Sequence, residues 1–184
     1  MIRLAVCVLV FSLAMPAVAQ PSPYAGQEMR QIKALAPEEI ADLLAGRGMG
    51  LARAAELNAY PGPMHVLELA AALELTRKQT AQLEDLKERM TADAMRLGLQ
   101  LVEAERELDG LFAGARITVA VLQEKAEAIG LLQGRLRAVH LAAHIETRAV
   151  LTPRQVQRYD ELRGYRQGSG GGGHRPGTGH PHRH

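Results

Sequence analysis

A five-residue pattern, Leu-Thr-x-x-Gln, occurs twice in this chain, as LTRKQ at 75–79 and as LTPRQ at 151–155. In each copy the threonine can act as a helix N-cap, and the glutamine three residues later can complete a capping box. The proline of the second copy suits the first position of a helix. One capping box would indicate only a helix start, whereas two copies before amphipathic stretches predict two equivalent helix entries. The motif residues are Leu75, Thr76, Gln79, Leu151, Thr152, Pro153 and Gln155.

Residues 1–19 have the pattern of a secretory signal peptide. Arg3 precedes an apolar stretch, and the small residues at 17–19 (AVA) fit a cleavage site before Gln20. The apolar stretch is shorter than the roughly 20 residues that span a bilayer. We therefore expect a periplasmic protein that does not span the membrane, with an uncleaved anchor as the alternative. The single cysteine, Cys7, lies in this segment, so no disulfide or thiolate chemistry is expected in the mature chain.

The composition of the mature chain favours helices. It has no tryptophan, Phe112 is its one phenylalanine, and alanine and leucine dominate. Between residues 20 and 165 there are 18 Lys and Arg against 20 Asp and Glu, so the basic character comes from the C-terminal tail. We expect no nucleic-acid partner, because the charge does not form a basic patch on the folded part.

The order of helix and turn signals predicts one all-α domain at 37–165, behind a flexible arm at 20–36 and ahead of a disordered Gly/His-rich tail at 166–184. The glycine run at 46–50 predicts a helix break; a phosphate cradle would need a preceding strand, and none is predicted. Helices are expected at 37–45, 51–58, 64–74, 76–112, 118–150 and 152–165, with a turn at 60–63.

Apolar residues in the two long predicted helices recur every three or four positions, which indicates a seam between packed helices. A short link around Gly114 would join them as an antiparallel hairpin. Glycine and small residues near 114 also fit a turn. The seam positions include Leu83, Leu86, Leu97, Leu101 and Leu108 in the first helix and Ile129, Leu132, Leu136 and Val139 in the second.

The two motif copies, the helical hairpin between them and the signal peptide resemble the Spy/CpxP family of periplasmic stress proteins, which is related to ZraP and to CnrX-type metal sensors. The resemblance covers about residues 60–165. It implies a hook- or cradle-shaped helical protein that forms a homodimer. It also implies an envelope-stress role: ATP-independent binding of unfolded periplasmic proteins, regulation of a membrane sensor protein, or a response to metals.

The helices carry methionines that suit contacts with flexible chains, because the methionine side chain adapts to irregular surfaces. We predict a client surface at Met64, Met90, Met95 and Leu97. The alternative for Met90 and Leu97 is that they fill the seam between the long helices, since helical stripes are usually core.

Histidines provide the candidate metal ligands. His174, His180, His182 and His184 stand in the glycine-rich tail, where neutral imidazoles could converge on zinc or another divalent transition metal. The alternative is a solvated basic tail. The GGGGH stretch at 170–174 is similar to the glycine-histidine tail of ZraP.

His140 and His144 are four residues apart on one predicted helix, so they point the same way and could supply two further ligands. A third ligand would have to come from elsewhere, with His65 or Glu68 conceivable. Ordinary histidines at the edge of the core are the alternative. CnrX has a His-x3-His before its first long helix, and this chain has only His65 in that region.

No catalytic or nucleotide-binding pattern is present in the sequence, so we expect neither an enzyme nor a nucleotide cofactor. The sequence predicts an ATP-independent periplasmic chaperone with a metal-binding tail. The alternative is a periplasmic sensor or buffer for zinc, nickel, cobalt or copper.

Overall fold

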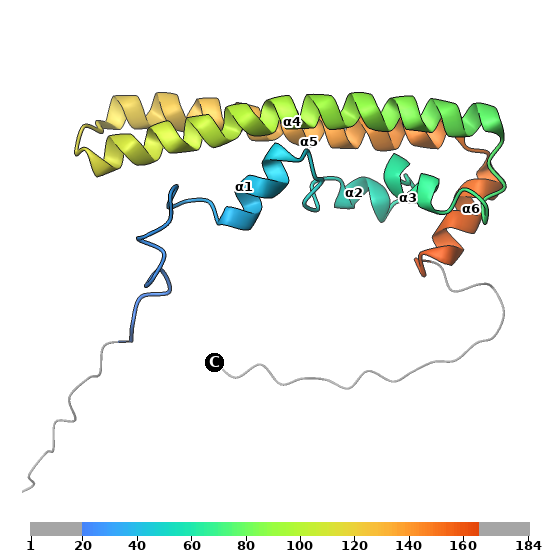
Figure 1. Cartoon of the computed structure of the whole chain (residues 1–184), viewed down its shortest axis with the longest axis horizontal. Coiled ribbons are helices and arrows are strands. Elements are labelled where there is room, and N and C mark those ends of the chain that lie inside the picture. The colour runs from blue at the N-terminus through green and yellow to red at the C-terminus, as the bar shows by residue number, and fades with distance from the viewer. Residues whose placement is uncertain (1–19, 166–184) are drawn as a thin grey trace, which may run out of the picture.

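The computed structural model describes residues 20–165, and every regular element within them is a helix (Figure 1). The predicted signal peptide at 1–19 and the tail at 166–184 lie outside the described residues. The helices are α1 (Pro37–Leu44), α2 (Arg53–Glu56), α3 (Pro63–Glu68), α4 (Arg77–Ala113), α5 (Val119–Val150) and α6 (Pro153–Leu162).

The long helices α4 and α5 pack together and carry the larger hydrophobic core. Their seam is built from residues spaced by three and four, which bring one face of each helix toward the other. An all-helical fold with two long helices packed together is therefore confirmed for the described part of the chain. The buried seam residues are Ala94, Leu97, Leu101 and Val102 of α4 and Ile129 and Leu136 of α5.

The three short helices α1, α2 and α3 lie along one side of the α4–α5 pair, and α6 lies at the end where α4 begins and α5 ends (Figure 1). Helix α1 crosses α4 at Gly98. A Cβ on Gly98 would lie 2.1 Å from the carbonyl oxygen of Leu43, so only glycine allows this approach of the two backbones. No helix between residues 20 and 165 is long and apolar enough to cross a bilayer.

The segment that precedes α1 is attached to the long helices. Ile32 is completely buried in the core of the α4–α5 pair. The backbone N–H of Lys33 donates to Asp109, and the Lys33 ammonium lies 3.1 Å from the same carboxylate. These contacts fix the end of the arm nearest α1, and its predicted flexibility stays a prediction.

Some helix ends differ from the sequence prediction. Helix α3 was expected to continue to Glu74, but it ends at Glu68 and turns follow. The turns end at Glu74, whose φ of +50° lies in the left-handed region. This conformation interrupts the right-handed turns just before the first motif copy begins at Leu75. Helix α6 ends at Leu162 rather than at Tyr165, because Gly164 adopts a φ of +74°, a common way to stop a helix.

Candidate functional site

The two motif copies begin helices α4 and α6 with the same capping box. The Thr76 hydroxyl accepts a hydrogen bond from the Gln79 backbone N–H at 3.2 Å, and the Gln79 side chain accepts from the Thr76 backbone N–H at 3.0 Å. The matching distances for Thr152 and Gln155 are 3.3 and 2.9 Å. Both helix starts therefore have the caps that the sequence predicts.

The two glutamines also bind each other. The Gln79 side-chain amide donates to the Gln155 oxygen at 2.9 Å, and the Gln155 amide donates back at 3.2 Å. Each amide also donates its second hydrogen to a backbone carbonyl oxygen next to the other motif copy. Gln79 donates to the carbonyl of Val150 at 3.0 Å, and Gln155 donates to the carbonyl of Leu73 at 3.1 Å. Every donor of these amides is used, so the motif offers no free group for chemistry.

A second hydrophobic core lies beneath the paired motif copies. Leu151 is buried in it and Leu75 packs against it, so each motif leucine anchors its copy. We call the paired motif copies and this core the motif corner. Its buried members are Val66, Leu73, Leu83, Leu151, Val156 and Tyr159.

A pocket of about 800 Å³ lies between the segment at 45–65 and one face of the α4–α5 pair, with Arg163 and Tyr165 at one end. We call it the side pocket. Three histidines and three methionines that are far apart in the sequence line it: His65, His140, His144, Met49, Met64 and Met90. The structure thus brings both predicted helical histidines and two of the predicted client residues to one place.

The four predicted client residues do not all lie on the surface. Met64 is 46% exposed and Met95 45% exposed, and Met90 is half-buried in the pocket wall. The prediction of Leu97 as a surface residue is wrong: it is 3% exposed and lies in the α4–α5 core. Its helical spacing places it on the seam, so the alternative that Leu97 fills the space between the long helices agrees with the structure.

His140 is a buried, uncharged side chain at neutral pH. Burial, and secondarily the nearby His144, lower its pKa below the ordinary histidine value. Its Nε2 atom is buried and has no hydrogen-bond partner among residues 20–165. His140 therefore adds polarity to the pocket wall but no positive charge.

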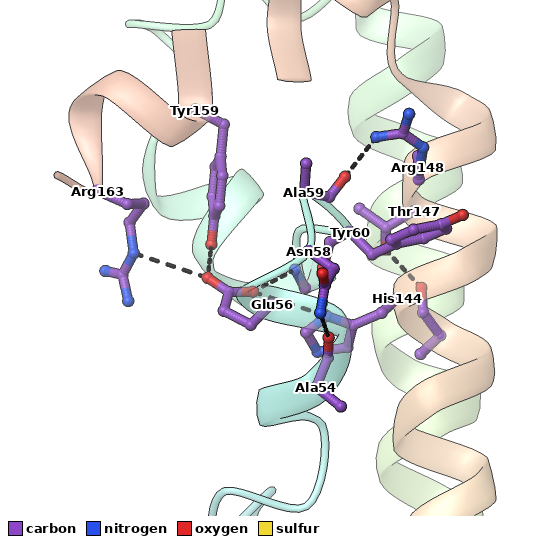
Figure 2. Close-up of polar contacts among 12 residues, drawn as sticks. Ala54, Glu56, Asn58, Ala59, Tyr60, His144, Thr147, Arg148, Tyr159 and Arg163 are labelled. Atoms are coloured by element: carbon purple, nitrogen blue, oxygen red, sulfur yellow. Dashed lines mark hydrogen bonds and ion pairs between the residues drawn. The ribbon is translucent and has the colours of Figure 1, made fainter. Parts of the chain in front are cut away.

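His144 is held at the pocket wall by the backbone. Its Nδ1 lies 2.7 Å from the carbonyl oxygen of Tyr60, which assigns the proton to Nδ1 because a carbonyl only accepts (Figure 2). Nδ1 is also 3.6 Å from the Glu56 carboxylate. The ring packs so closely on Gly62 that a Cβ there would lie 2.9 Å from Nε2.

Glu56 connects α2 to α5 and α6 (Figure 2). Its carboxylate accepts hydrogen bonds from the Tyr159 hydroxyl, from the Tyr165 hydroxyl at 3.1 Å and from the Gly62 N–H at 3.2 Å. Arg163 lies 3.9 Å away. Burial and the Glu56 carboxylate raise the pKa of Tyr159, so its hydroxyl remains a donor. Nothing in the local sequence around Glu56 signals this role, because its partners are all distant along the chain.

The described residues do not complete a metal site. Between residues 20 and 165, no three His, Cys, Asp or Glu side chains come together as a group that could hold an ion. The conceivable third ligands His65 and Glu68 contact each other at 2.9 Å. The helical pair His140 and His144 thus supplies two ligands at most, and whether it binds a metal stays a prediction.

The four tail histidines, His174, His180, His182 and His184, lie outside the described residues. Comparison with protein-family models, with curated proteins and with solved structures finds no match to this chain.

Proposed function

We propose that this protein is a periplasmic chaperone of the Spy/CpxP type, which holds unfolded proteins without ATP. In this proposal the α4–α5 pair is a helical hairpin, the short helices complete a hook or cradle, and two copies form a homodimer. The tail histidines bind zinc or another divalent transition metal.

The observation that carries the proposal is the exposure of flexible apolar side chains beside the side pocket. Met64 lies on the pocket wall, and Met95 contacts Gly46 on the same wall. Nearly half of each methionine is exposed. Adaptable apolar side chains bordered by charges are the kind of surface that binds many unrelated chains.

The client proposal can be tested by light scattering from reduced α-lactalbumin as it aggregates. The mature protein should suppress scattering at stoichiometric ratios without ATP. Replacing Met64 and Met95 with serine should remove most of the suppression, because the apolar contact area is lost. Met29→Ser is the matched control, since this methionine is 87% exposed but lies in the N-terminal arm. No suppression by the wild-type protein, with or without zinc, would overturn the proposal.

A second candidate function is a sensor or buffer for zinc, nickel, cobalt or copper, acting with a membrane sensor protein as partner. The observation that favours it is that His140 and His144 of α5 line one pocket, where they could supply two ligands. Zinc titration by calorimetry should lose most of its signal when residues 168–184 are deleted. Unchanged binding after this deletion would move the site from the tail to the helices.

A further inference from the structure

We propose that the side pocket is a binding site for a small aliphatic carboxylate, which is an unbranched acyl chain with one anionic head. The site would hold one molecule per chain, with its carboxylate at Arg53 and Lys87 and its chain between the 45–65 segment and α4–α5. This proposal does not rest on the client-holding function or on a bound metal.

The charges on the pocket favour an anion. Of its charged lining residues, Arg47 pairs with Asp42, and Arg163 lies beside Glu56. Arg53 and Lys87 line the pocket from the short-helix segment and from α4, and neither makes an ion pair within residues 20–165.

Glu56 does not offset these two cations. It is the one acidic residue that lines the pocket, and its carboxylate already accepts hydrogen bonds from Tyr159, Tyr165 and the Gly62 N–H. Two cations without partners therefore face the pocket, and a carboxylate is a group that both can bind.

The rest of the lining favours an aliphatic chain over a ring system. Met49, Met64 and Met90 supply flexible apolar contacts. Among the described residues that line the pocket, Tyr165 is the one Tyr, Phe or Trp side chain, so the apolar part of the lining comes mainly from flexible side chains.

The size of the pocket agrees with a ligand of this kind. Its volume of about 800 Å³ falls within the range of roughly 300–1,000 Å³ that is common for small-molecule sites. The segment 45–65 forms its outer wall, and α4 and α5 form its floor with Met90 and His140.

Calorimetry of the mature full chain with three ten-carbon probes tests the proposal: decanoate, decanol and decyltrimethylammonium, each below its micelle concentration. Decanoate should bind saturably at one molecule per chain. Decanol should bind roughly tenfold more weakly, because it has no carboxylate to form charge-assisted hydrogen bonds with the two cations. The expected difference is no larger because solvent screens these bonds. The ammonium probe should not bind measurably.

Two sets of variants locate the ligand. Arg53→Gln with Lys87→Gln should weaken decanoate roughly tenfold and leave decanol unchanged. Lys78→Gln is the control, because this lysine is also exposed on α4 but lies outside the side pocket. Met90→Ser should weaken both decanoate and decanol. Equal affinity for all three probes, no saturable binding of decanoate, or wild-type affinity in the double variant would overturn the proposal.

Discussion

The motif corner and the side pocket both include residues of the two long helices. They differ in whether their polar side chains have hydrogen-bond or ion-pair partners within the described residues. At the corner, both amide hydrogens of Gln79 and both of Gln155 have acceptors. At the pocket, Arg53 and Lys87 lack ion-pair partners and the Nε2 of His140 is buried without a hydrogen bond within the described residues. The corner amides are satisfied within the fold, whereas the pocket has polar groups without a partner among the described residues, and our proposals place binding there.

The largest effect is expected from a change at the crossing of α1 and α4, away from the motif corner. Gly98→Ala places a Cβ 2.1 Å from the Leu43 carbonyl oxygen, so α1 must move away from α4. We expect the free energy of unfolding to fall by about 3 kcal/mol in urea titrations. Gly134→Ala in α5 is the control: its Cβ would meet nothing within 4 Å, so a gain of about 0.5–1 kcal/mol is expected. Equal stability of the two variants would contradict the close crossing.

The next largest loss of stability is expected from a change at the motif corner. Gln79→Ala removes the bonds to Gln155 and to the Val150 carbonyl and leaves the latter without a donor. We expect a loss of about 2 kcal/mol in the free energy of unfolding. In a double-mutant cycle with Gln155→Ala, the two changes should couple by about 1 kcal/mol. Strict additivity would show that the glutamines do not act as a pair.

The cap of the second motif copy should matter less. Thr152→Ala removes the hydroxyl that accepts from the Gln155 N–H, and thermal unfolding should report a loss of about 1 kcal/mol. Thr152→Ser keeps the acceptor and serves as the control. If the alanine variant is as stable as the serine variant, the capping box does not stabilise α6.

The smallest expected effect is a pH dependence of the free energy of unfolding. It comes from His140, which lines the side pocket and is not part of the motif corner. The pKa of His140 is lowered in the folded state, so the unfolded chain binds a proton more readily. The stability that neutral His140 contributes is therefore present above about pH 6.5, the usual histidine pKa, and is lost as the pH falls through its folded pKa. Urea titrations from pH 8 to 5 should show a shallower decline for His140→Gln than for the wild type. Equal slopes for the two proteins would contradict this role of His140.

Local patterns predicted those parts of the fold that depend on neighbours in sequence. Thr76 and Thr152 cap helices because their partners are three residues away, and the seam of α4 and α5 follows from helical spacing. The turns after Glu68 were not predicted, because Leu69 and Leu73 continue an apolar pattern that is equally compatible with a helix.

The contacts that define the candidate site were harder to predict, because they join distant segments. The exchange between Gln79 and Gln155 spans 76 residues, and that between Glu56 and Tyr159 spans 103. Helical spacing placed Leu97 on the seam and left Met95 off it, and Leu97 is buried whereas Met95 is 45% exposed. The approach of α1 to α4 at Gly98 was not predicted, because it joins segments more than 50 residues apart.

The most direct test compares the two regions in one aggregation assay. Wild-type protein, Thr152→Ala and the Met64→Ser/Met95→Ser variant are mixed with reduced α-lactalbumin at equal concentration, at a temperature where circular dichroism shows all three folded. Wild type and Thr152→Ala should suppress scattering equally, and the methionine variant should lose most of the suppression. Full suppression by the methionine variant, or its loss in Thr152→Ala alone, would contradict a functional surface that is separate from the motif.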